Sequence, residues 1–214
     1  MNYRVPFFHV FLWVFTISTQ GVFPSDGYAQ SWVNPSFEAT PQEAFTPVGW
    51  TPCSPETTPD IFPGVWGVTM DPADGSSYLG LITRSDGSNE SIGQRIPILL
   101  EKDRCYTFSF FLSTADTYAG FNEPILCRIW LGDHSCQRNQ LIFESDPLKT
   151  PYWNKKSVRF SPLYDAKFLI IEAGFPSSDQ TARGNILLDG ITSILPCDRT
   201  YPFDFRDSIR SRMS

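Results

Sequence analysis

Histidine is scarce in this sequence: the 214 residues contain only two, and one of them, His9, lies in an apolar N-terminal run. The other, His134, follows Gly132 and Asp133 in a predicted hairpin turn, where a lone histidine is usually solvated. A Ser–His–Asp mechanism would depend on that one side chain, and no two carboxylates have a spacing that indicates a glycosidase pair. We therefore expect no catalytic activity. A small hydrolase is the alternative that the shortage of histidine disfavours.

Apolar runs of membrane-spanning length are also missing. Met1–Arg4 carries one positive charge, Val5–Ile17 is almost wholly apolar, and the polar stretch that follows ends in Tyr28-Ala29-Gln30. This order is typical of a secretory signal peptide, predicted here as residues 1–30. An uncleaved anchor is the alternative, although a membrane span needs about 20 apolar residues. We expect an exported protein, periplasmic, at the cell surface or secreted, that does not span the membrane after cleavage.

Clusters of basic residues are absent as well. The chain has 17 Lys and Arg against 23 Asp and Glu, a net charge of −6, and its basic residues are scattered. This pattern argues against nucleic acid and against an anionic membrane surface as partners. Residues 199–214 are polar and net basic, and we interpret them as a peripheral tail.

Five cysteines follow the predicted signal peptide: Cys53, Cys105, Cys127, Cys136 and Cys197. Export favours disulfides over free thiols or metal sites. Cys127 and Cys136 flank a predicted hairpin, so we predict a disulfide between them. A second bridge among the other three would leave one sulfur over, and the sequence does not say which.

Helical periodicity is not evident between Gln30 and Cys197, whereas strand patterns are frequent. In the stretch 105–113 the side chains of Tyr106, Phe108, Phe110 and Leu112 point to one side, which is typical of a strand with one buried face. Turn-forming residues separate the predicted strands. These strands are Tyr78–Thr83, Ser91–Ile98, Cys105–Ser113, Ile125–Leu131, Leu141–Glu144, Lys156–Phe160, Phe168–Ala173 and Ile186–Leu195. Many short strands of this kind predict an all-β sandwich or barrel.

The chain before these strands is less regular. Ser31–Glu38 is predicted to be a short opening strand that Pro35 interrupts, which places it at an edge or a bulge. Ala39–Asp74 is rich in proline and has little periodicity, and so long an irregular stretch is usually functional or disordered. Because it contains many residues of the buried type, we predict an ordered loop lying over one end of the sandwich.

Several short motifs resemble those of galactose-binding-like jelly rolls, the group that includes many carbohydrate-binding modules. They are Asn34-Pro-Ser-Phe-Glu38 with Gly49-Trp50, Gly75-x-x-Tyr78-Leu-Gly80-Leu, Glu90, Leu99-Leu100, Cys105-Tyr106-Thr-Phe-Ser-Phe, and Ile186-Leu-Leu-Asp189-Gly-Ile191. The sequence is similar to versions found in exported Bacteroidetes proteins. The resemblance implies one antiparallel jelly-roll β-sandwich over residues 31–198.

The resemblance also implies a structural calcium ion joining the first and last strands. The matching positions are the carboxylates of Glu38 and Asp189, with oxygen atoms from Asn34 or Ser36. Carboxylates and loop oxygens suit calcium. Gly190 stands where the family often has a second acidic residue, which puts one ligand in doubt. The alternative is that Glu38 and Asp189 only cap backbone turns.

By the same analogy, a ligand would bind at the loop-rich end or on the concave sheet face. Sugar recognition uses exposed aromatic faces with polar groups beside them, so we predict Trp66, Tyr118 and Asn122 as ligand-binding residues, with Arg84 and Asp116 as polar helpers. The alternative is that these aromatics pack their loops onto the domain. The predicted function is glycan recognition. A structural or accessory subunit of an envelope or surface assembly, such as secretion or motility machinery, that binds a protein partner is the second hypothesis.

Overall fold

The computed structural model describes residues 31–198. The predicted signal peptide (1–30) and tail (199–214) lie outside the described residues. In chain order the strands are β1 (Thr51–Pro52), β2 (Asp60–Phe62), β3 (Tyr78–Ile82), β4 (Ser91–Leu100), β5 (Tyr106–Ser113), β6 (Leu126–Gly132), β7 (Gln140–Glu144), β8 (Asn154–Phe160), β9 (Ala166–Gly174), β10 (Asn185–Asp189) and β11 (Leu195–Pro196).

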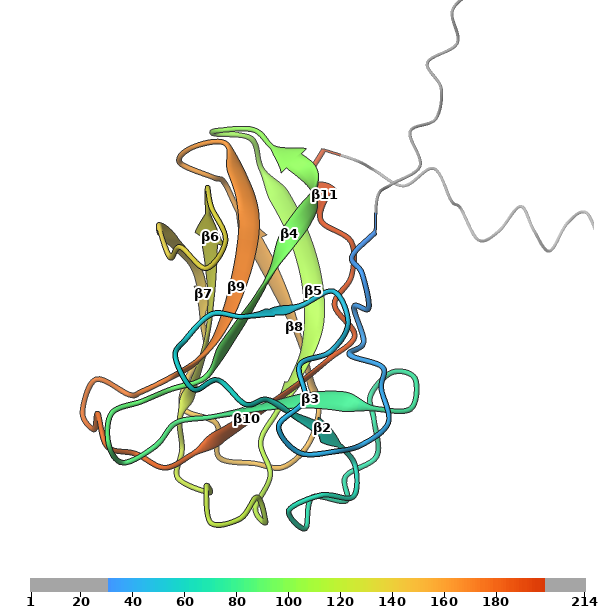
Figure 1. Ribbon diagram of the computed structural model, residues 1–214. Helices are drawn as coiled ribbons and strands as arrows, with labels where there is room; N and C mark the ends of the chain where they lie inside the picture. Colours follow the sequence, from blue (N-terminus) through green and yellow to red (C-terminus); the bar gives the residue numbers. More distant parts are fainter. Residues whose placement is uncertain (1–30, 199–214) are drawn as a thin grey trace, which may run out of the picture.

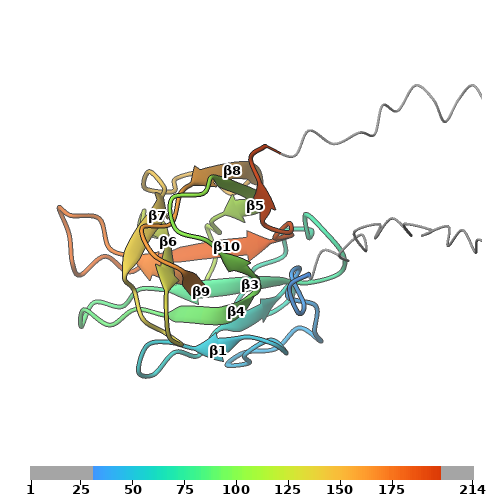
Figure 2. The ribbon, with the colours of Figure 1, turned by 90° about the horizontal axis from the view of Figure 1, so that it is seen from above.

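The strands form two antiparallel sheets packed face to face (Figure 1). One sheet has the order β1-β4-β9-β6-β7, and the other has the order β11-β5-β10-β3-β2, with β8 paired to β5. Seen from above, β1 and β4 lie at one side of the sandwich and β5 and β8 at the other (Figure 2). The predicted antiparallel jelly-roll β-sandwich is confirmed. Residues 31–198 contain no helix long and apolar enough to cross a membrane.

The core lies between the sheets, and β5 follows the predicted alternation. Tyr106, Phe108, Phe110 and Leu112 are all at most 3% exposed, whereas the residues between them are half-buried. Phe110 meets Phe143 of the opposite sheet edge-on, with ring centroids 5.4 Å apart. Fully burying each large apolar side chain contributes about 1.5–3 kcal/mol, so this strand is a main source of stability.

The irregular stretch after residue 38 is ordered, as predicted, and it also forms two short strands that were not predicted. Ile61 and Phe62 of β2 are completely buried, and β2 extends the second sheet by pairing with β3. β1 pairs with β4 only at Ile92 and Gly93. The long loop is therefore anchored to both sheets.

The prediction of an opening strand over Ser31–Glu38 was wrong, because the structure has no strand there. Asn34 and Phe37 have φ angles of 50° and 54°, and this left-handed backbone cannot continue a β-ladder. The segment is instead held by single hydrogen bonds, for example from the Trp32 indole N–H to the Thr192 carbonyl at 3.0 Å. The predicted last strand was too long for a related reason: β10 ends at Asp189, because Gly190 has a φ of 56°.

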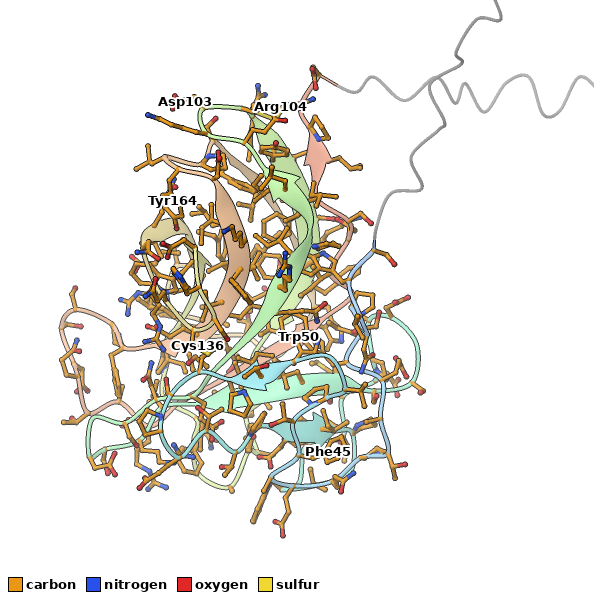
Figure 3. The ribbon with its side chains drawn as sticks, turned by 45° about the horizontal axis from the view of Figure 1, so that its top comes forward. Phe45, Trp50, Asp103, Arg104, Cys136 and Tyr164 are labelled. Carbon is orange, nitrogen blue, oxygen red and sulfur yellow. A yellow bond between two sulfur atoms is a disulfide. The ribbon has the colours of Figure 1, made fainter. Side chains whose placement is uncertain are left out.

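The predicted Cys127–Cys136 disulfide was also wrong. The structure pairs Cys53 with Cys136 and Cys105 with Cys197, and leaves Cys127 as a buried thiol. Alternation along β6 turns Cys127 into the core, whereas Cys136 lies in the loop after that strand, where Figure 3 labels it. The two sulfur atoms therefore cannot meet across the hairpin.

Candidate ligand-binding site

Trp66 lies in the loop between β2 and β3 and is 46% exposed. Its φ angle of 50° is uncommon for a residue other than glycine, and such strained positions concentrate at functional sites. A tight turn surrounds it, in which the Gly64 N–H donates to the Val68 carbonyl at 2.8 Å. The turn is fixed to a second loop, because the Thr117 hydroxyl donates to the Gly67 carbonyl at 2.8 Å. The exposed ring is thus held by two loops.

A cavity of about 220 Å³ lies beside the Trp66 ring, and we call it the Trp66 pocket. Its lining residues are Glu43, Ala44, Thr58, Asp60, Trp66, Ile82, Tyr118, Ala119 and Phe121. Aromatic and aliphatic groups form most of its surface, and Glu43, Thr58 and Asp60 add oxygen atoms. This combination suits a small ligand with one apolar face and several hydroxyl groups.

Tyr118 lines the Trp66 pocket, but its side chain is almost wholly buried. The residue is 1% exposed, and its hydroxyl donates a hydrogen bond to the Asp60 carboxylate. The Phe62 ring packs edge-on against it, with centroids 4.8 Å apart, and burial raises its pKa well above the usual value. Tyr118 therefore offers no exposed face for stacking, because its own loop and β2 cover its ring, and a role of Tyr118 in ligand binding stays a prediction.

Arg84 does not line the Trp66 pocket, but it contacts Glu90 and the lining residue Thr58. Its Nη2 atom lies 2.5 Å from Oε1 of Glu90, which is completely buried. The same carboxylate accepts hydrogen bonds from the Thr58 N–H at 3.1 Å and the Thr58 hydroxyl at 3.0 Å. Burial raises the pKa of Glu90, while Arg84 and these hydrogen bonds oppose that effect. The ion pair therefore fixes Thr58, and a direct contact of Arg84 with a ligand stays a prediction.

The other two predicted ligand residues lie outside the lining of this pocket. Asp116 is exposed and lines a separate cavity of about 240 Å³ with Thr114 and Met70. Asn122 is exposed and follows Phe121. The structure thus brings Trp66 and Tyr118 to one pocket and places Asp116 and Asn122 nearby along the same loop. Their roles stay predictions.

Sequence reasoning missed Glu43, Thr58 and Asp60 as pocket residues. Asp60 begins β2, which has only three residues, too few for a periodic pattern to reveal a strand. Its Oδ1 atom accepts a hydrogen bond from the Ala44 N–H at 2.8 Å, a contact between two parts of an irregular loop. No residue spacing in the sequence indicates such a contact.

The carboxylates of Glu144 and Glu172 are held by guanidinium groups. Arg128 Nε lies 2.6 Å from Glu144, and Arg138 Nε lies 2.6 Å from Glu172, which is 7% exposed. Glu172 also lies 3.7 Å from Arg128 Nη1. Two guanidinium groups therefore hold the Glu172 carboxylate in ion pairs.

Three of the predicted calcium ligands are already engaged with protein groups. The Asn34 side chain exchanges hydrogen bonds with the backbone of Glu38 at 2.7 and 3.1 Å. The Glu38 carboxylate accepts hydrogen bonds from the Ser76 N–H and hydroxyl. Ser36 donates to Asp74 at 2.5 Å. These contacts match the alternative reading, in which the groups fix turns.

Asp189 differs from the other three. It is completely buried, and its Oδ2 atom accepts hydrogen bonds from the backbone of Ala73 and Asp74 at 2.9 and 2.8 Å. Its Oδ1 atom has no hydrogen-bond partner among the described residues, and burial raises its pKa to about 7. Residues 31–198 show no cluster of three or more His, Cys, Asp or Glu side chains able to hold a metal. A calcium ion bound by Glu38 and Asp189, with oxygen atoms from Asn34 or Ser36, stays a prediction.

Comparisons with known proteins agree with this fold. No protein-family profile and no curated protein matches the sequence. Among solved structures, the CBM22-1 xylan-binding domain of Paenibacillus barcinonensis Xyn10C aligns with a TM-score of 0.52 at 16% identity, over 80% of this chain and 97% of that domain. The CBM22-1-CBM22-2 tandem of the same protein aligns with a TM-score of 0.52 at 17% identity, over 84% of this chain and 51% of the tandem.

A third structure, the arabinose-bound MgGH51 α-L-arabinofuranosidase, aligns with a TM-score of 0.55 at 16% identity, over 79% of this chain and 26% of that enzyme. At such low identity the likeness establishes the architecture alone. The chain therefore has the jelly-roll fold of carbohydrate-binding modules.

Proposed function

We propose that this domain is a non-catalytic glycan-binding module of an exported protein, and that a sugar unit binds in the Trp66 pocket. The observation that carries the proposal is the exposed Trp66 ring beside a small cavity with a mostly apolar lining. A pyranose has apolar C–H faces and polar edges, so it stacks on an indole and donates its hydroxyls to carboxylates. Glu43 and Asp60 are the acceptors at this pocket.

Two further features support the proposal. The chain shares its fold with the CBM22-1 domain of Xyn10C, which is a xylan-binding domain. The two disulfides, Cys53–Cys136 and Cys105–Cys197, are typical of proteins that work in an oxidising environment outside the cytosol. The cavity of about 220 Å³ favours one sugar unit or a chain end over the middle of a long chain.

A glycan array with the chain beginning at Ser31, in the presence of calcium or of a chelator, tests the proposal. We expect saturable binding to a limited set of glycans, lost on Trp66→Ala. Tyr152 is 58% exposed and does not line the pocket, so Tyr152→Ala is the matched control. Absence of binding to any glycan, together with a stoichiometric protein partner from solubilised envelopes, would replace this function with that of an accessory subunit.

A further inference from the structure

A separate cavity lies along β4, away from the Trp66 pocket. It has a volume of about 660 Å³, and we call it the β4 groove. Its lining includes Val33, Thr51, Arg95, Ser135, Lys167 and Phe168. None of them lines the Trp66 pocket.

Along most of its length, β4 has no paired strand on the side opposite to β9. β1 pairs with β4 only as far as Gly93. At the next residue, the Gln94 side chain takes the place of a strand: its amide accepts from the Val33 N–H at 2.8 Å and donates to the Val33 carbonyl at 2.9 Å. This contact fixes the position of Val33, which lines the groove together with residues of β4.

Close contacts fix the walls of the groove. A Cβ atom at Gly93 would lie 2.9 Å from Sγ of Cys53, so the disulfide to Cys136 rests directly on the sheet. That bond holds the loop of Ser135 against the chain beside Thr51. The opposite wall is equally tight, because a Cβ atom at Gly49 would lie 2.5 Å from Cγ1 of Val33.

The charge of the groove is opposite to that of the protein. Its charged lining residues are Arg95 and Lys167, without a carboxylate, although the chain carries a net charge of −6. Both side chains are exposed, and neither lies within 4.0 Å of an acidic group in residues 31–198. Arg95 is the register partner of Phe168, the neighbour of Lys167. Two cations without an acidic partner and the Phe168 side chain therefore line the same groove.

We propose that the β4 groove binds an acidic saccharide chain, with Arg95 and Lys167 on its carboxylate or sulfate groups. Guanidinium and ammonium groups bind such anions through charge-assisted hydrogen bonds. Phe168 offers an apolar surface to a sugar ring, and Thr51 and Ser135 offer hydroxyls. An acidic peptide fits less well, because a peptide would add a strand to β4 and Pro97 removes a backbone donor from that edge. The choice of a saccharide rests on the proposed glycan-binding function, whereas the site is independent of the Trp66 pocket.

Affinity measurements with defined polymers test this site. Alginate supplies carboxylates, dextran sulfate supplies sulfates, dextran is the neutral control and poly-L-glutamate represents an acidic peptide. We expect alginate, dextran sulfate or both to bind, more weakly at high salt. The double variant Arg95→Gln/Lys167→Gln should lose affinity at least about tenfold. The pair Lys149→Gln/Lys155→Gln removes the same charge from exposed positions outside the groove and should bind normally.

The variant Trp66→Ala distinguishes binding at the β4 groove from binding at the Trp66 pocket. It should leave binding of the acidic polymer unchanged, so that either site can fail without the other. Equal losses in both double variants, equal binding of dextran or poly-L-glutamate, or no binding of either acidic polysaccharide would overturn the proposal. The ratio of alginate to dextran sulfate affinity identifies the anionic group.

Discussion

The sulfur atoms of Cys53 and Cys136, 83 residues apart in sequence, form a disulfide that lies directly on Gly93 near the start of β4. The bond joins the irregular N-terminal stretch to the loop after β6, and it forms part of the frame of the β4 groove. We expect Cys53→Ser/Cys136→Ser to lower the free energy of unfolding by about 2–5 kcal/mol, because the open chain gains conformational entropy when unfolded. Urea denaturation measures this loss. An unchanged midpoint would contradict it.

The thiol of Cys127 should be unreactive in the folded protein. The residue is completely buried, and burial raises the pKa of its thiol, so the nucleophilic thiolate is scarce and inaccessible. A thiol reagent should label one cysteine per chain after unfolding and none before. Peptide mapping should recover Cys53–Cys136 and Cys105–Cys197. A Cys127–Cys136 peptide would show that the described pairing is wrong.

The hydrogen bond between Tyr118 and Asp60 should stabilise the floor of the Trp66 pocket. Tyr118→Phe leaves a buried carboxylate without this donor, and we expect a loss of about 1–3 kcal/mol in the free energy of unfolding. Tyr152→Phe is the control, because that residue is exposed and its hydroxyl has no hydrogen bond within residues 31–198. Thermal or urea unfolding of both variants gives the comparison. Equal stability of the two variants would show that the buried contact contributes nothing.

Calcium should stabilise the protein through Asp189 if the predicted metal site is real. A ligand present at 100 times its Kd stabilises a protein by about 2.7 kcal/mol, which a shift in Tm between calcium and chelator would reveal. Asp189→Asn should abolish the shift. Asp146→Asn, at an exposed carboxylate, should retain it. A wild-type Tm that does not respond to calcium would mean that Asp189 binds no calcium and only accepts hydrogen bonds from the backbone N–H groups of Ala73 and Asp74.

The sequence predicted the sheets where one face of a strand is buried. In β5 the alternation from Tyr106 to Leu112 reports burial directly, and the structure agrees. Prediction from the sequence failed where single contacts between distant segments decide the conformation. The bond from Trp32 to Thr192 and the left-handed backbone at Asn34 replace the expected opening strand, and neither leaves a periodic signal.

The candidate site was predictable in part for the same reason. An exposed tryptophan in a loop rich in proline is visible in the sequence, and Trp66 does line a pocket. The burial of Tyr118 depends on its contacts with Asp60 and Phe62. Those residues belong to β2, which is too short for its pattern to be recognised. The prediction of the cysteine pairing was wrong for the same reason, because the disulfide between Cys53 and Cys136 joins two irregular segments that have no periodic pattern.

The most direct test of the glycan-binding function is calorimetric titration of a glycan identified on the array into wild-type protein, Trp66→Ala, Trp66→Phe and Tyr152→Ala. We predict that Trp66→Ala weakens binding at least about tenfold, that Trp66→Phe retains part of the affinity because it keeps an aromatic face, and that Tyr152→Ala binds as the wild type does. Unchanged affinity of a folded Trp66→Ala protein would contradict the assignment of the sugar to the Trp66 pocket.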